Sequence, residues 1–308
     1  MAGGSSHKPT TVYAAIVANG LIAIGKFIVA GFTGSSAMLS EAIHSVADSG
    51  NQALLLLGIR LSRREPSPDH PFGHGKELYF WSLIVAIVLF GVGGGISLYE
   101  GLIHLQHPAE LSDPFWNYVM LGIAVILETA AFVIAFRALV RVAGEESMWQ
   151  AVRTSKDPTI FVVLFEDAAA LAGLLVAFLG IFFAHQLNMP VLDAVASIVI
   201  AGILMSVAVF LAYESRKLLL GEAARPDIVA AVKQIAMADE AIAEARQPMT
   251  MHFGPAEILL NMDLRFEKGL STAEITAAVD RIEAAIRKRY PQVKRIFIEV
   301  DALLAIEA

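Results

Sequence analysis

The residues best suited to bind a metal ion lie in one apolar stretch, residues 34–52, which reads GSSAMLSEAIHSVADSGNQ. His44 and Asp48 are four residues apart, so on a helix they lie one above the other on the same face. An imidazole and a carboxylate at this spacing can bind one divalent metal ion. Ionisable groups inside a membrane are costly and usually face a partner or a water-filled path. The stretch therefore indicates half of a metal site on a transport route, or else a pH-sensitive polar packing pair.

Two more polar side chains lie on the same face, Glu41 one turn before the pair and Asn51 one turn after it. We treat both as additional candidates for the site. Three other ionisable residues fall in apolar stretches. Lys26 is expected to snorkel or to pair with a carboxylate, Glu128 to line a water path or to make a structural hydrogen bond, and Asp193 to cap its own helix.

Composition places these residues in a membrane protein. The chain has 308 residues, of which 56% are hydrophobic and only 17% charged, and its mean hydropathy is +0.62. These values fit several membrane spans. The absence of cysteine excludes disulfides and thiolate metal sites. A net charge of −7 offers no basic surface to nucleic acid, so we expect no nucleic-acid partner.

The elements that position the candidate residues are six apolar segments of spanning length: 12–33, 36–59, 80–103, 116–140, 159–184 and 190–213. The third contains Gly91 and Gly95, whose spacing predicts close helix packing. Lys and Arg occur in the connections 60–79 and 141–158 but not in 104–115 or 185–189. The positive-inside rule then predicts that both termini are cytoplasmic.

From residue 221 the composition is that of a soluble domain. Pro226 opens a predicted helix, and Ser271 with Glu274 forms a capping box for a second one that ends before Pro291. We predict the elements in this order: helix 226–239, extended segment 242–253, strand 258–266, helix 271–290 and strand 295–300. The fold class is thus an all-α six-helix membrane domain followed by a small α+β (α-β-β-α-β) domain.

Three domains follow: a cytosolic tail at 1–11, a six-span transport domain at 12–217 and an α+β dimerisation domain at 221–308. At about 90 residues the last has a modest core, which pairing with a second copy would supplement. The first ten residues are short and polar, so we expect neither a signal peptide nor a transit sequence. We expect a multi-pass protein of the bacterial inner membrane.

The sequence resembles the cation diffusion facilitators, which export Zn²⁺ and related divalent metals. The resemblance rests on SAMLSEAIHSVAD at 36–48, on DHPFGHGKE at 69–77, and on six spans followed by a small α+β domain. LFEDAAA at 164–170 is most similar to a branch that includes a mitochondrial zinc exporter of animals.

The resemblance implies a transport site with two ligands from span two and two from span five. His44 and Asp48 match the first pair and Asp167 one member of the second, but Val163 stands where the family has histidine. Glu166 lies about 100° from Asp167 around an ideal helix. It would complete the site only in a distorted helix, and otherwise carries protons or pairs with another span. Asn51 or water could also fill the shell.

Two further metal sites of the family are only partly matched. His70 and His74 match a histidine pair, with Asp69 beside them, but Ser67 replaces an aspartate; they either bind metal weakly or cap the third span. In the C-terminal domain the family often binds two metal ions. Here only a weak site is expected, from His252, Glu299 and Asp301, and dimerisation is the favoured role.

The resulting hypothesis is a secondary transporter that exports a divalent metal, Zn²⁺ above others, in exchange for protons. The metal is expected to be cargo rather than a cofactor. Protons compete with the metal for the site, because its ligands must lose protons to bind it. The partners expected are metal, protons, the bilayer and a second copy. The alternatives are a Mn²⁺, Fe²⁺ or Co²⁺ exporter and a non-transporting metal-sensing scaffold, which Val163 favours. An enzyme is not expected, since HExxH and GxSxG are both absent.

Overall fold

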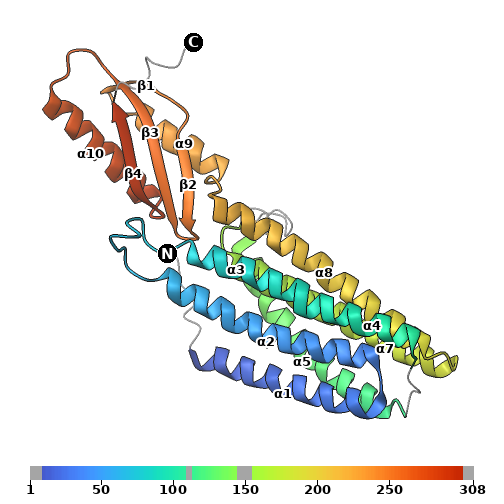
Figure 1. Cartoon of the computed structure of the whole chain (residues 1–308). Helices are drawn as coiled ribbons and strands as arrows, with labels where there is room; N and C mark the ends of the chain where they lie inside the picture. The colour runs from blue at the N-terminus through green and yellow to red at the C-terminus, as the bar shows by residue number, and fades with distance from the viewer. Residues whose placement is uncertain (1–8, 109–112, 144–154, 301–308) are drawn as a thin grey trace. The chain divides into compact units, whose positions relative to one another are not determined.

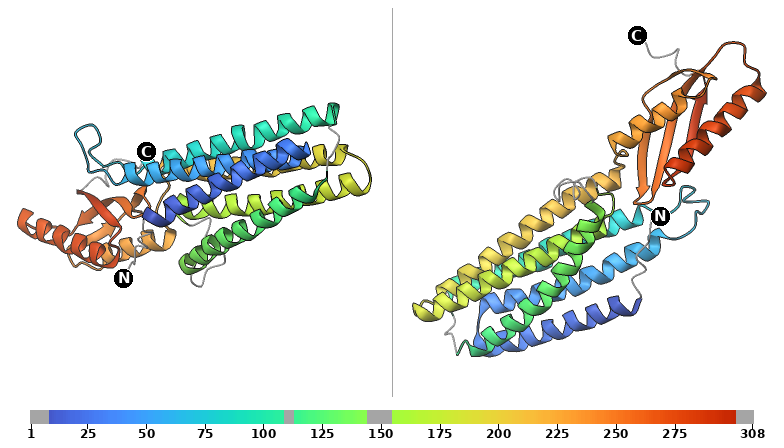
Figure 2. Two further views of the ribbon diagram at one scale, coloured as in Figure 1. Left: turned by 90° about the horizontal axis from the view of Figure 1, so that it is seen from below. Right: turned by 180° about the vertical axis from the view of Figure 1, so that it is seen from behind.

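Long helices run side by side through the first two thirds of the chain (Figure 1). In this computed structural model the described residues are 9–108, 113–143 and 155–300. The helices are α1 (Pro9–Thr33), α2 (Ser36–Ser62), α3 (Glu77–Val88), η1 (Leu89–Ile96), α4 (Ser97–Gln106), α5 (Phe115–Ala143), α7 (Pro158–Gln186) and α8 (Val191–Leu220). Because α3, η1 and α4 form one continuous helix, each of the six predicted spans corresponds to one long helix. The other views show the same arrangement (Figure 2).

Four of the described helices are long and apolar enough to cross a membrane: Glu77–Gln106, Phe115–Arg141, Pro158–Gln186 and Val191–Leu220. The described part of α1 includes a shorter apolar helix, Asn19–Thr33. α2 is more polar, because its buried side contains three serines, Glu41, His44, Asp48 and Asn51. The least apolar of the long helices thus carries the residues singled out for metal binding.

Glycines allow the third span to approach α8 closely, but not at the predicted positions. A Cβ at Gly94 would lie 2.5 Å from Met205 Cγ, and one at Gly101 would lie 2.7 Å from Ile198 Cγ1. Gly91, by contrast, has nothing within 4 Å of its Cβ position, and a Cβ at Gly95 would meet only a carbonyl of its own helix. The packing prediction for Gly91 and Gly95 was therefore wrong. It assumed a regular α-helix, whereas η1 is a π-helix and changes which residues face α8.

The chain divides into two units. One contains the described residues up to Arg60 and from Phe80 to Ser215; the other contains Leu61–Tyr79 and the described residues from Arg216 onward. The second unit has helices α9 (Pro226–Met237) and α10 (Thr272–Arg289) and strands β1 (Ile242–Ala245), β2 (Met249–Gly254), β3 (Glu257–Phe266) and β4 (Val293–Val300). β1 and β2 pair antiparallel with successive parts of β3, and β4 pairs parallel with it.

Buried and more exposed residues alternate along β3, and the buried ones show which face of the sheet the helices α9 and α10 cover. Ile258, Leu260, Met262 and Leu264 are buried in one core with Val232 of α9 and Ile282 of α10. The residues between them, from Glu257 to Arg265, lie on the other face. The α+β class is confirmed, but the order is α-β-β-β-α-β.

The predicted extended segment 242–253 is interrupted at residues 246–248, so β1 and β2 are separate strands. Pro248 has no N–H to donate to a ladder at this position. The predicted capping box is present: the Glu274 N–H donates to Ser271 Oγ at 3.3 Å, and the Ser271 N–H donates to Glu274 Oε2 at 2.7 Å. Arg281 of α10 contacts the turn that follows α9. Its guanidinium donates two hydrogen bonds of 2.9 Å to Asp239.

The connection between α2 and α3 packs on the sheet face that α9 and α10 leave open. The Phe72 ring centroid is 5.3 Å from that of Phe253 in β2 and 6.5 Å from that of Phe297 in β4. The Arg295 guanidinium lies over the Phe72 ring at 5.2 Å. Gly75 follows, and any Cβ there would collide with the Phe253 carbonyl. This residue must therefore be glycine for the connection to lie so close to β2.

Candidate metal site

The N-terminal end of α2 is fixed by a carboxylate from α8. Asp193 accepts hydrogen bonds from Ser35 Oγ at 2.7 Å, from Ser36 Oγ at 3.0 Å and from the main-chain N–H of Ser36. The free N–H groups and positive dipole at a helix start favour a carboxylate there. Asp193 therefore caps α2 and not, as expected from the sequence, its own helix.

A chain of hydroxyls fastens α2 one turn further along. Ser40 and Ser197 of α8 share a hydrogen bond of 2.5 Å between their Oγ atoms. Ser197 Oγ in turn donates to the main-chain carbonyl of Ser97 at 3.0 Å, at the start of α4. Both contacts are buried, so they hold α2 against α8 and α4 and set its rotation.

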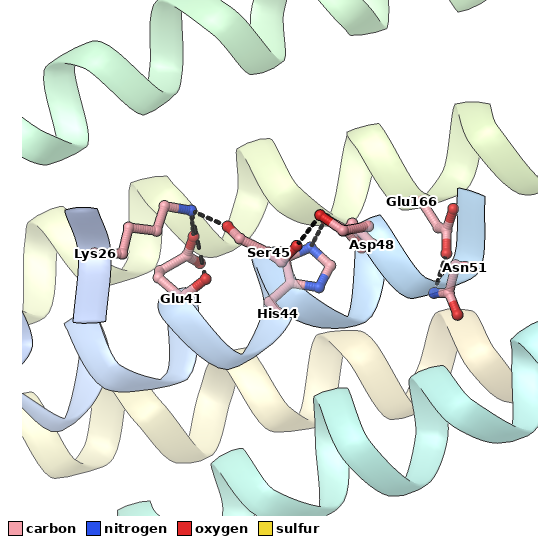
Figure 3. Close-up of polar contacts among 8 residues, drawn as sticks. Lys26, Glu41, His44, Ser45, Asp48, Asn51 and Glu166 are labelled. Atoms are coloured by element: carbon pink, nitrogen blue, oxygen red, sulfur yellow. Dashed lines mark hydrogen bonds and ion pairs between the residues drawn. The ribbon is translucent and has the colours of Figure 1, made fainter. Parts of the chain in front are cut away.

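His44 and Asp48 follow on the next turns of α2, with their side chains in contact (Figure 3). The distance from His44 Nε2 to Asp48 Oδ2 is 3.4 Å, and both residues are buried. Neither ring nitrogen of His44 has a hydrogen-bond partner among the described residues, and neither does Asp48 Oδ1. Buried polar atoms are usually paired. These atoms therefore have the chemistry of metal ligands that are not committed to the fold.

α7 contributes two acids on adjacent positions. Asp167 is 8% exposed, and its Oδ2 has no hydrogen-bond partner within the described chain. Glu166 is 4% exposed and accepts a hydrogen bond from Asn51 Nδ2 of α2 at 2.5 Å. The sequence predicted that Glu166 completes the site only if α7 is distorted, and otherwise carries protons or pairs with another span. α7 is a regular α-helix, and the Glu166 side chain pairs with another span through Asn51 of α2 (Figure 3).

Glu41 lies one turn before His44 and is engaged by a cation. Lys26 of α1 donates a hydrogen bond of 3.0 Å to Glu41 Oε2 and one of 2.9 Å to Ser45 Oγ. The expected pairing of Lys26 with a carboxylate is thus observed. The other oxygen of Glu41, Oε1, faces Gly173 of α7, where any Cβ would collide with it. Glu128 of α5 is also buried, at 7% exposure.

The candidate ligands lie in one buried region without forming a closed cage. Across residues 9–108, 113–143 and 155–300, no three His, Asp or Glu side chains are close enough together to hold a metal ion. α2 and α7 meet at the contact between Asn51 and Glu166. The side-chain oxygens of Asn51 and Gln52 are buried without a hydrogen-bond partner in the described chain. Gln52 was not among the candidates from the sequence, although its position beside Asn51 was visible there.

The histidines of the α2–α3 connection are neighbours, with ring centroids 4.5 Å apart. The turn that holds them is closed by main-chain hydrogen bonds between Ser67 and His70, and the His74 carbonyl accepts the Glu77 N–H at the start of α3. Asp69 does not join them in a group of three potential ligands, since the described residues contain none. This turn provides at most a histidine pair.

The residues proposed for a weak C-terminal site do not converge. His252 pairs with Ile258, a core residue, and is buried beneath the helices, where its Nδ1 lies 3.2 Å from the Gly254 carbonyl. Glu299 pairs with Asp263 on the opposite face and accepts a hydrogen bond from Asn261. One metal ion cannot bind both. The part of the expectation that joined His252 with Glu299 was wrong, because strand pairing places the two residues on opposite faces. Asp301 lies outside the described residues.

Residues 12–220 match the family model described as the cation efflux transmembrane domain. This chain is a cation diffusion facilitator. It is 30% identical to the mitochondrial proton-coupled zinc antiporter SLC30A9 of Xenopus laevis, over 94% of this chain and 59% of that protein. It is 23% identical to the manganese efflux system protein MneP of Bacillus subtilis, over 93% of each chain. The magnetosome protein MamM of Paramagnetospirillum magneticum is 27% identical over 58% of this chain and 52% of its own length.

This cation diffusion facilitator therefore spans only about three fifths of the length of the zinc antiporter it matches. The family is one of transporters and not of enzymes, and the apolar helices make the chain a multi-pass membrane protein. In such a protein a divalent metal would be the transported substrate and not a resident cofactor.

Proposed function

We propose that this protein exports Zn²⁺ in exchange for protons, with His44, Asp48 and Asp167 as the metal ligands. The observation that carries the proposal is the buried contact between His44 and Asp48 on α2. Both ring nitrogens and one carboxylate oxygen of this pair have no hydrogen-bond partner in the described chain. Imidazole and carboxylate are both good ligands for Zn²⁺. The Xenopus laevis relative is named as a proton-coupled zinc antiporter, which supports the same proposal.

Proton exchange follows from the chemistry of these ligands. A histidine and two aspartates bind a metal ion only after losing their protons, so protons and metal compete for the same atoms. If the site opens to one side of the membrane at a time, metal leaves one way as protons enter the other. Glu166 and Asn51 adjoin the site and are candidates for the remaining coordination positions or for carrying the proton.

Manganese is the second candidate. Val163 removes one histidine from the family pattern, which leaves the site richer in oxygen, and Mn²⁺ prefers oxygen ligands. The relative MneP, a manganese efflux protein, aligns over nearly all of this chain. The two candidates share one site and differ in the metal that moves fastest. Fe²⁺ and Co²⁺ are tested in the same way.

The decisive experiment is flux of Zn²⁺ and Mn²⁺ into liposomes that contain the purified full-length protein, with and without an imposed pH gradient. We expect the gradient to drive Zn²⁺ uphill. S49A is the matched control, because Ser49 lies on α2 beside Asp48 but its hydroxyl donates to the Ser45 carbonyl. A wild-type protein that moves no metal would instead favour a metal-sensing scaffold.

For the surroundings of the site we propose the bacterial cytoplasmic membrane, with both termini on its cytoplasmic side and residues 12–217 as the membrane domain. The distribution of Lys and Arg among the connections supports this orientation. We further propose that residues from 221 onward pair two copies of the chain. Light scattering of the detergent-solubilised full-length protein tests this, since a monomer at all concentrations would contradict it.

A further inference from the structure

Lys26 is a cation in an unusual place. It is 1% exposed, and it is the one Lys or Arg among the buried side chains of the described residues. Its ammonium meets Glu41 Oε2 at 3.0 Å and Ser45 Oγ at 2.9 Å, and the Glu41 carbonyl at 3.5 Å (Figure 3). A buried ammonium is stable only when paired and hydrogen-bonded, and these three oxygens fulfil that need. Lys26 is therefore committed to one turn of α2.

Glu41 belongs by position to the metal-binding face. It lies three residues before His44, so the two side chains are neighbours on the helix surface. Its Oε1 is buried without a hydrogen-bond donor in the described chain, and Gly173 leaves room for that oxygen against α7. Glu41 thus places one carboxylate oxygen beside the candidate site, and Lys26 holds its other oxygen.

We propose that Lys26 is a positioning residue that sets metal preference: its ammonium keeps Glu41 out of the ligand set of the metal bound by His44 and Asp48. This inference rests on the proposed function. With Glu41 held, the metal meets one imidazole and the carboxylates of Asp48 and Asp167, whose two negative charges match a divalent ion. Releasing Glu41 would add a third carboxylate. Added oxygen ligands favour Mn²⁺ over Zn²⁺.

Three variants separate this role from simple packing. K26M frees Glu41, and we expect it to raise the ratio of Mn²⁺ to Zn²⁺ transport roughly tenfold, the scale on which changes around metal ligands act. E41Q removes the carboxylate that Lys26 holds and leaves the ratio unchanged. K26M/E41Q removes both charges and returns the ratio to that of the wild type. An ion pair with only a structural role would change protein yield or melting temperature but not metal preference.

T33V is the matched control. Thr33 also lies on α1, and its hydroxyl donates to Asn117 Oδ1 at 3.0 Å in a buried contact that does not involve Glu41. The variant therefore loosens α1 without freeing a carboxylate, and we expect the wild-type ratio. If T33V shifts metal preference as much as K26M does, the effect is general loosening and the proposal is wrong.

The measurement is competition between Zn²⁺ and Mn²⁺ for transport by the full-length protein in liposomes, together with binding of each metal to the same protein in detergent. A shift in K26M that E41Q reverses supports the proposal; a folded K26M with the wild-type ratio overturns it. If K26M does not fold, E41Q decides, because a changed ratio in that variant means that Glu41 is already a ligand. A wild-type protein that transports and binds neither metal refutes the proposed function itself.

Discussion

Two neighbouring parts of α2, its first turns and the turns that carry His44 and Asp48, differ in how their polar groups are hydrogen-bonded. At its start, both oxygens of Asp193 accept hydrogen bonds, and Ser40 is bonded to Ser197. Two turns later, both ring nitrogens of His44 and one oxygen of Asp48 are buried without a hydrogen-bond partner in the described chain. An unpaired buried polar group costs roughly 1–3 kcal/mol. The satisfied contacts fix the position of the helix, and the unsatisfied atoms are those that a metal ion would use.

This comparison predicts the largest effect on transport at His44 and Asp48, whose buried polar atoms lack hydrogen-bond partners. H44A and D48A should each reduce Zn²⁺ flux at least about 100-fold, since each removes a ligand whose loss the remaining ligands cannot replace. Because these side chains make few bonds within the fold, the melting temperature of the detergent-solubilised protein should change little. Normal flux in both variants would refute the assignment of the site.

The next effect separates the neighbouring acids of α7. D167N should lower flux about tenfold more than E166Q, because Asp167 Oδ2 is unpaired whereas Glu166 is already bonded to Asn51. Both substitutions keep the shape of the side chain and remove its charge, so each serves as a control for the other. The reverse order in the liposome assay would make Glu166 the ligand.

At the start of α2 we expect the opposite: a substitution should lower stability and leave metal preference unchanged. D193A leaves the hydroxyl and N–H donors of Ser35 and Ser36 without their acceptor, at a cost of about 3 kcal/mol. We expect a lower melting temperature and less folded protein, but an unchanged ratio of Zn²⁺ to Mn²⁺ flux in the molecules that fold. A change in that ratio would show that the start of α2 takes part in metal selection.

The smallest effect concerns the second unit, far from these helices in sequence. Hydrogen bonds from Arg281 hold the pKa of Asp239 below its usual range. This pair therefore stabilises the fold above about pH 4, the carboxyl pKa in the unfolded chain, and the contribution disappears as the pH falls through the lower folded value.

D239N should lower the melting temperature at neutral pH by no more than roughly 2–4 °C, as is usual for an exposed ion pair. Below about pH 4 the difference between the variant and the wild type should shrink as the pH falls, and differential scanning fluorimetry across pH would reveal this. A difference that stays constant down to pH 3 would mean that packing, and not the charge of Asp239, stabilises this junction.

The sequence predicted correctly the contacts between residues that are close together along one helix. The contact of His44 with Asp48 and the capping box of Ser271 arise from fixed spacings of four and three residues. The partner of Lys26 could only be named as some carboxylate. Contacts between helices depend on how each is rotated, which residue spacing does not reveal.

The errors have the same origin. Asp193 caps a different helix from the one expected. The π-helix η1 moved the close contacts from Gly91 and Gly95 to Gly94 and Gly101. In the sheet, His252 and Glu299 fell on opposite faces because the pairing with β3 was unknown. Each of these contacts depends on how two helices or two strands pack against each other, which the sequence of one element does not determine.

The contact of Phe72 with the sheet also has a consequence for biosynthesis. Phe72 leaves the ribosome 225 residues before Phe297, the later of its two aromatic partners. At 5–20 residues per second this interval lasts on the order of 11–45 s. During that time α2 and α3 are already made, but the sheet face on which the connection between them packs is incomplete. A nascent chain that stalls before β4 therefore leaves Phe72 without its contact with Phe297 and more exposed to water, where chaperones and proteases can recognise it.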